Sequence, residues 1–150
     1  MVYKFRPLSS EQDWKRLQQM ISECVLYMGP AAYLNDTTEG RVELRGTPDV
    51  VQRFYQAIEE MRLDVCVLSF SEALTEPLMW AHYAQGFQGV AFGFDRTLCD
   101  WMSELYPVDY RDSVPIIDID GLGETDLADS LIDAVLLTKS GQWSYERELR

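Results

Sequence analysis

The run Val65-Cys66-Val67-Leu68-Ser69-Phe70 is the most strand-like stretch of the sequence. It is almost continuously apolar and carries two β-branched residues, which is typical of a strand buried on both faces. Before it, residues 47–62 carry apolar side chains at helical spacing after the pair Thr47-Pro48, a favourable helix start. The sequence therefore predicts a helix that leads into a central strand over residues 65–70.

Toward the N-terminus, short elements alternate with one long polar segment. Residues 2–5 read as an opening strand closed by Pro7, and Ser10 offers an N-cap for a helix whose apolar residues run from 14 to 24. Residues 25–28 form a short apolar run and predict a second strand. Residues 29–47 predict a long loop with a weak strand at 41–44, and long loops in compact domains are often functional.

Toward the C-terminus, the predicted elements are also short. Helices are expected at 75–84, 97–105 and 126–137, and strands at 89–94, 108–110 and 115–119, with 143–150 unassigned. The strands are not separated by regular crossover helices, so an α+β fold fits better than a doubly wound one. We expect a single compact α+β domain over residues 1–150, with a mixed, largely antiparallel central sheet flanked by helices.

The composition excludes several classes of protein. The chain is 47% hydrophobic, which excludes intrinsic disorder, and its formal net charge of −12 opposes non-specific binding to nucleic acid. It has no apolar run of the ~20 residues that span a membrane and no apolar signal-peptide core, so a cytoplasmic location is expected. The cysteines Cys24, Cys66 and Cys99 include no CxxC pair, which predicts buried free thiols in a reducing compartment.

Standard catalytic motifs are absent. The sequence has no nucleotide-binding P-loop, no complete dinucleotide fingerprint and no Gly-x-Ser-x-Gly. His82 is the only histidine and is interpreted as structural rather than as a base. Asp112, Asp118 and Asp120 could hold a divalent ion, but a solvated acidic loop is favoured in so acidic a chain, so no metal site is predicted.

The last residues carry a more specific pattern. After Lys139, the segment Trp143-Ser144-Tyr145-Glu146-Arg147-Glu148-Leu149-Arg150 places two acids two residues apart, on one face if the chain is extended. Neighbouring aromatic rings exclude water and raise a carboxyl pKa. The alternative is a charged terminal strand with salt bridges.

The sequence resembles a bacterial and phage family known as a domain of unknown function, DUF2971. The resemblance rests on an ordered set of individually weak motifs, which are Lys4-Phe5-Arg6, Asn35-Asp36, Ser69-Phe70-Ser71-Glu72, Met79 to Ala84, Gly86, Gly89, Phe92 to Asp95, Tyr110, Lys139, Trp143, Tyr145, Glu146, Glu148 and Arg150. The loop after Asn35-Asp36 lacks the family's usual proline. Similar proteins continue beyond the position of Arg150, so a C-terminal part of the domain is expected to be missing.

The resemblance implies which polar residues share a cleft, but no settled activity. The implied set is Arg6, Asn35, Asp36, Ser69, Ser71, Trp80, Tyr83, Lys139, Glu146, Glu148 and Arg150. Similar proteins also suggest a role in mobile elements or host defence.

The order of these residues suggests an analogy with ADP-ribosyltransferases of the Arg–Ser–Glu type. Arg6 would match the arginine of a first strand, Ser69-Phe70-Ser71 the middle Ser-x-Ser, and Glu146-Arg147-Glu148 the late Glu-x-Glu. NAD would be the substrate. Glu148 would stabilise the oxocarbenium-like state of its glycosidic bond, with Glu146 toward the acceptor, and the arginine would hold a phosphate. This is an analogy of residue type and order.

Two other hypotheses remain open. One is a metal-dependent phosphodiesterase or nuclease that uses Asp36, Glu146, Glu148 and Lys139. The other is a non-catalytic binding or sensing module whose recognition surface consists of Trp80, Tyr83, Trp143 and Tyr145, with the charged residues paired structurally. The partner is then a small molecule or a protein, and the substrate, cofactor and oligomeric state stay open. The test is whether Arg6, Ser69 and Glu148 converge on one open pocket.

Overall fold

Helices and antiparallel strands confirm the α+β class. The computed structural model describes residues 1–97 and 100–150. Contacts within the chain define two compact units: unit 1 contains Met1–Tyr27, Leu68–Pro107 and Ser144–Arg150, and unit 2 contains Met28–Val67 and Val108–Trp143. The single domain over residues 1–150 stays a prediction.

Unit 1 is built on a four-stranded sheet. Its strands are β1 (Val2–Arg6), β5 (Phe70–Ser71), β6 (Val90–Phe94) and β10 (Glu148–Leu149), in the order β10-β5-β1-β6. Every pairing in this sheet is antiparallel, which agrees with the predicted, largely antiparallel central sheet.

Both faces of this sheet are apolar, because successive side chains of a strand point to opposite sides. One face contributes to a cluster of Val2, Phe70, Met102 and Leu149, next to the 3₁₀ helix Asp100–Glu104. The other face packs against α3 (Pro77–Tyr83) through a cluster of Phe5, Ala73, Met79 and Ala84. The site residues of unit 1 therefore lie on a sheet that is covered from two sides.

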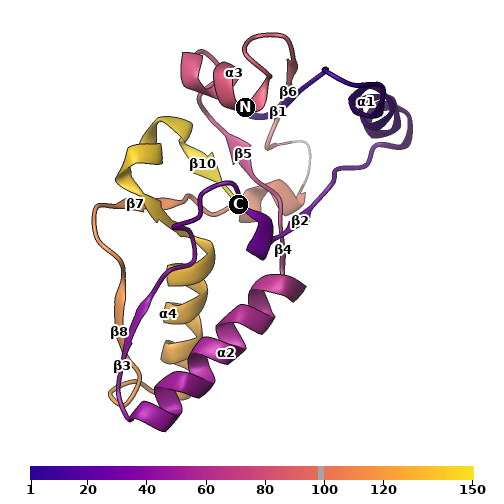
Figure 1. Cartoon of the computed structure of the whole chain (residues 1–150). Coiled ribbons are helices and arrows are strands. Elements are labelled where there is room, and N and C mark those ends of the chain that lie inside the picture. The colour runs from indigo at the N-terminus through magenta and orange to yellow at the C-terminus, as the bar shows by residue number, and fades with distance from the viewer. Residues whose placement is uncertain (98–99) are drawn as a thin grey trace. The chain divides into compact units, whose positions relative to one another are not determined.

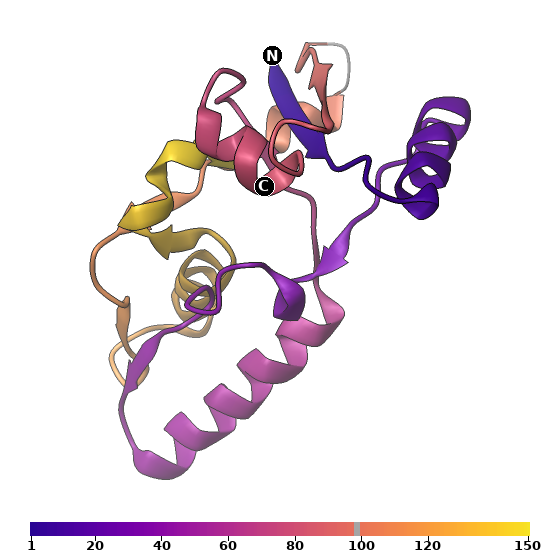
Figure 2. The same cartoon turned by 45° about the horizontal axis from the view of Figure 1, so that its top comes forward.

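Helix α1 (Glu11–Glu23) depends little on packing. Ser10 and Asp13 form the predicted N-cap as a reciprocal capping box. No residue of α1 is buried, and Trp14 and Ile21 on its apolar side are 52% and 62% exposed. Figure 2 shows α1 standing to one side of the strands of unit 1.

Unit 2 pairs two helices with three small ribbons. Helices α2 (Pro48–Asp64) and α4 (Glu124–Leu136) lie side by side (Figure 1). Two ribbons are parallel, β3 (Glu43–Arg45) with β8 (Ile116–Asp118) and β7 (Asp109–Arg111) with β9 (Thr138–Ser140), and β2 (Gly29–Pro30) pairs antiparallel with β4 (Cys66–Val67). The 3₁₀ helix Ala31–Tyr33 also lies in unit 2, and the 3₁₀ helix Gly141–Glu146 begins in unit 2 and ends in unit 1. The core contains Val42, Leu44, Ile58, Ile117, Ile119, Leu127, Ala134 and Val135.

The predicted central strand over residues 65–70 is wrong as one element. Its first half, β4, pairs with β2 in unit 2, and its second half, β5, pairs with β1 in unit 1. The chain passes from one unit to the other between Val67 and Leu68. Phe70 is the buried residue of this run, whereas Cys66 is exposed, so the expected burial of the whole run is also wrong. The hydrogen-bond partners that divide the run come from distant parts of the chain, which an apolar pattern does not reveal.

Three smaller predictions also need correction. Residues 25–28 form no strand, and Val25, Tyr27 and Met28 are exposed. The helix expected at 97–105 appears as the 3₁₀ helix Asp100–Glu104, while 98–99 lie outside the described residues. Cys24 and Cys66 are free but exposed rather than buried, and Cys99 lies outside the described residues.

The remaining predicted helices and strands lie close to their predicted ranges, as with α2 and β6, whereas strands β2, β9 and β10 were not predicted. None of the helices in the described ranges combines the length and the apolar character that crossing a membrane requires.

Candidate functional site

A row of directly opposed residues crosses the sheet of unit 1. Glu148 on β10 faces Ser71 on β5, Ser71 faces Tyr3 on β1, and Tyr3 faces Gly93 on β6. Opposed residues of neighbouring strands point to the same side of a sheet. Ser71 and Glu148, which are distant in the sequence, therefore share one face, the face that Tyr3 and Phe5 present to α3.

Arg6 does not join them. It stands opposite Val90, and alternation along β1 places it on the face of Val2, away from Tyr3. Burial, reinforced by the nearby Arg16, holds the pKa of Arg6 below its usual value. Among the described residues it forms no ion pair. The register therefore places Arg6 on the face of β1 opposite to the one that Ser71 and Glu148 share.

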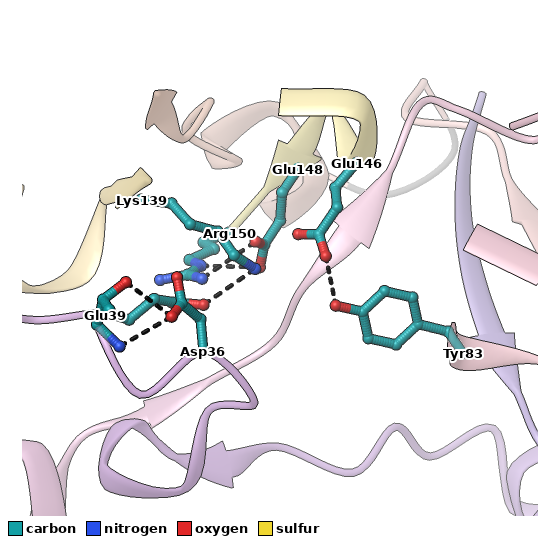
Figure 3. A network of polar contacts seen from close by, with 8 residues as sticks. Asp36, Glu39, Tyr83, Lys139, Glu146, Glu148 and Arg150 are labelled. Carbon is teal, nitrogen blue, oxygen red and sulfur yellow. Dashed lines mark hydrogen bonds and ion pairs between the residues drawn. The ribbon is translucent and has the colours of Figure 1, made fainter. Parts of the chain in front are cut away.

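The two acids of the C-terminal pattern are buried and engaged. The Arg150 guanidinium donates two hydrogen bonds to the Glu148 carboxylate, with Nε–Oε1 and Nη2–Oε2 distances of 2.8 and 3.1 Å. Both side chains are less than a tenth exposed. The Glu146 carboxylate accepts a short hydrogen bond from the Tyr83 hydroxyl (Figure 3). These contacts form a closed polar cluster beside β10.

Ser71 and Trp80 bond to backbone groups through their side chains, and Ser69 accepts a hydrogen bond through its carbonyl. Ser71 Oγ donates to the carbonyl of Glu146 and accepts from the amide of Ala73. The indole of Trp80 donates to the carbonyl of Leu74 at 2.6 Å and meets the ring of Phe5 edge to face. The carbonyl of Ser69 accepts from the Lys4 amine at 2.6 Å. Ser71 and Trp80 thus also tie distant segments of unit 1 together.

Lys4, on the same face of β1 as Val2, is a largely buried cation that the predicted set of site residues omitted. Burial, with a smaller contribution from Arg6, lowers the pKa of its amine from 10.5 to about 8. Its ammonium also lies over the ring of Phe70, at 5.9 Å. The sequence did indicate this burial. Lys4 lies two residues after the apolar Val2, so in a strand both side chains point to the same covered face.

The pKa of Lys4 predicts a pH-dependent stability. Between pH 8 and 10.5 the folded protein releases this proton while the unfolded chain keeps it, so the free energy of unfolding rises with pH. Below pH 8 the cost of burying the charge is present in full. We expect the stability of the wild type relative to Lys4→Met to be flat up to about pH 8 and to increase from there to 10.5.

Urea denaturation at a series of pH values measures this difference. Lys15→Met, at a lysine whose side chain is 63% exposed, is the matched control and should show no such increase. A Lys4→Met difference that is independent of pH would contradict the buried amine.

The other three predicted site residues lie in unit 2. Lys139 forms an ion pair with Glu39 at 2.9 Å, with side-chain exposures of 1% and 0%, and its ammonium lies 4.9 Å from the ring centre of Trp143. The buried Asp36 accepts from the amide and hydroxyl of Thr38 through one oxygen. Asn35 is exposed. The loop predicted to be functional therefore supplies Glu39, a buried acid that sequence reasoning did not single out.

Metal-binding geometry is absent from the described ranges. Residues 1–97 and 100–150 contain no group of three or more His, Cys, Asp or Glu side chains that could hold an ion. The metal-dependent phosphodiesterase hypothesis has no ligand set there. His82 is exposed, with its ring 6.3 Å from those of Tyr83 and Tyr145.

Comparison with known proteins identifies a family without an assigned activity. The family model described as "Protein of unknown function (DUF2971)" matches residues 79–150, so the chain resembles that family over this range. The matched range includes Trp80, Tyr83, Lys139, Glu146, Glu148 and Arg150. The motifs before residue 79 stay a prediction. No curated protein and no solved structure matches the chain.

Proposed function

We propose that unit 1 is an ADP-ribosyltransferase-like module that cleaves the nicotinamide glycosidic bond of NAD. The observation that supports this is the position of Glu148 directly opposite Ser71, on a strand pair whose next neighbour, β1, carries Arg6. The arginine, serine and glutamate motifs of the analogy thus fall on three adjacent strands of one sheet. They are widely separated in the sequence, so this adjacency comes from the fold.

The chemistry assigns a role to each acid. Positive charge develops on the ribose as nicotinamide leaves, and a carboxylate held beside it stabilises that state. Glu148 has this role, and Glu146, fixed by Tyr83, faces the acceptor. Burying a carboxylate costs free energy of solvation. The burial of two carboxylates in one small unit therefore supports a functional role for them.

The opposite orientation of Arg6 requires a change in the analogy. Arg150 is the cation in contact with Glu148, and a guanidinium binds a diphosphate as readily as a carboxylate. In this proposal the Glu148–Arg150 pair is the resting arrangement. When NAD binds, its diphosphate replaces Glu148 as the partner of the Arg150 guanidinium. The Glu148 carboxylate is then available to stabilise the charge on the ribose. Trp80 and Tyr83, on α3, supply rings for stacking on nicotinamide.

The test is release of nicotinamide from NAD by the purified protein, followed by chromatography. Glu148→Gln keeps the shape and removes the charge, and we expect it to lower the rate by about 100- to 1,000-fold. Glu72→Gln, at an exposed acid of the same unit, is the control and should keep the wild-type rate. Circular dichroism verifies that both variants are folded. Equal release by the wild type and Glu148→Gln, or none from the folded wild type, would refute the transferase proposal.

A binding or sensing module is the second candidate. It is favoured by the closed contacts of both acids, Glu148 with Arg150 and Glu146 with Tyr83, which leave the polar cluster paired within the protein. A ligand that raises the melting temperature of the wild type without being turned over would support this candidate over catalysis. NAD is tested in the same melting experiment and in the nicotinamide assay. A raised melting temperature without nicotinamide release supports the binding module, and release supports catalysis.

A further inference from the structure

Unit 2 contains a hollow that none of the predicted roles explains. Its volume is about 200 Å³, and it lies between the turn at residues 38–41, the loop at 111–115 and strand β9. Six polar side chains matter for its chemistry, and they are Thr38, Arg41, Arg111, Asp112, Ser113 and Ser140.

The charge of this hollow is opposite to that of the chain. Two arginines line it and only one acid, Asp112, whereas the whole chain has a net charge of −12. Arg41 is exposed and forms no ion pair within the described part of the chain. Arg111 pairs with Asp109, two residues away, and both side chains are more than half exposed. An exposed pair of this kind contributes little free energy, so Arg111 is available to a ligand.

Hydroxyl groups add donors beside the guanidinium groups. Ser113 and Ser140 line the hollow, and neither hydroxyl has a hydrogen-bond partner among residues 1–97 and 100–150. Thr38 already donates to Asp36, and Lys139, also in the lining, is paired with Glu39. The donors available to a ligand are therefore two hydroxyls, the guanidinium group of Arg41 and that of Arg111, whose exposed pair with Asp109 a ligand can replace.

The walls are held by backbone contacts. Arg111 on β7 stands opposite Ser140 on β9 in a parallel ribbon, which fixes one arginine beside one hydroxyl. The amide of Glu43 donates to the carbonyl of Pro115 at 2.8 Å and ties down the 111–115 loop. A Cβ at position 141 would come within 2.4 Å of Asp112 Oδ1, so Gly141 allows the chain to approach this wall closely. The donors thus stand on a preorganised frame.

From this arrangement we propose that the hollow binds the phosphate group of a small phosphate monoester. Guanidinium and hydroxyl donors placed on different walls match a tetrahedral dianion, and arginine suits phosphate in particular. The volume is below the ~300 Å³ at which pockets for drug-sized ligands begin, so the ligand is small. This site is separate from the proposed NAD chemistry of unit 1 and does not depend on it.

The test measures binding of inorganic phosphate and of glycerol 3-phosphate by isothermal titration calorimetry, with chloride at matched ionic strength as the reference. We expect both phosphates to bind and the monoester to bind more tightly. Arg41→Gln and Arg111→Gln should each weaken binding about tenfold, because each removes a charge-assisted hydrogen bond. Asp112→Asn should strengthen binding, because it removes the only acid of the lining.

Arg53→Gln, at an exposed arginine of α2 outside the hollow, is the matched control and should leave binding unchanged. The opposite signs expected for the arginine and aspartate variants distinguish a site from general attraction to the surface. Phosphate binding no stronger than that of chloride, or an equal loss in Arg53→Gln and Arg41→Gln, would overturn the proposal.

Discussion

Replacing Lys139 with methionine is expected to lower the free energy of unfolding by roughly 3–5 kcal/mol, the usual cost of removing one partner from a buried ion pair. The Lys139–Glu39 pair is almost inaccessible to solvent, with exposures of 1% and 0%. Removal of the ammonium leaves the Glu39 carboxylate buried without its lysine, so the ion pair no longer offsets the cost of desolvating that charge. The cation–π contact between the Lys139 ammonium and the ring of Trp143 is lost as well. Urea denaturation followed by circular dichroism measures the change.

A second substitution separates charge from packing. In Lys139→Met/Glu39→Gln the buried charge is gone, so we expect most of the lost stability to return, because neutral replacements of buried pairs are often well tolerated. Lys15→Met, which breaks the exposed Glu11–Lys15 pair, should cost less than about 1 kcal/mol. A loss as small as this control in Lys139→Met would show that water reaches the pair in solution.

Phe70→Ala should be similarly severe, at about 3–5 kcal/mol, for a different reason. Phe70 is 2% exposed, and its ring meets that of Phe94 edge to face at 5.4 Å. It also belongs to the cluster of Val2 and Leu149, so truncation leaves a cavity between three strands of unit 1. The cavity adds to the lost transfer free energy because a sheet held by hydrogen bonds cannot collapse fully around it. Thermal and urea unfolding both report this loss.

The matched control for Phe70 is Phe87, a phenylalanine of the same unit. Phe87 is 62% exposed, so Phe87→Ala should cost less than about 1 kcal/mol. Similar losses for the two variants would mean that Phe70 is less enclosed than the structure shows.

Local signals predicted much of the fold. The Ser10–Asp13 capping box and the proline in the first turn of α2 lie next to the helices they begin, so the local sequence alone predicts both starts. The side chain of Thr47 makes no cap hydrogen bond. Strands β1 and β6 were also predicted within a residue of their observed bounds, because their apolar pattern is supported by adjacent turn or polar residues.

Long-range pairing could not be predicted in the same way. Alternation along β1 is enough to predict that Arg6 and Val2 point to the same face. The face on which Ser71 and Glu148 lie depends instead on the register between strands that are far apart in the sequence. The partner of Lys139 was missed for a related reason. Glu39 lies in a polar loop without periodicity, and nothing near it in the sequence distinguishes it from the other acids.

The segmented construction of unit 1 has a consequence for biosynthesis. A ribosome delivers the chain from its N-terminus at about 5–20 residues per second, and strand β10 emerges long after β5. Until then, the side of β5 that later pairs with Glu148 and Leu149 has no neighbour, and it adjoins the apolar residues Leu68 and Phe70. Open edges next to apolar segments invite pairing between chains. We therefore expect nascent molecules to need protection by chaperones for several seconds, until the last strand closes the sheet.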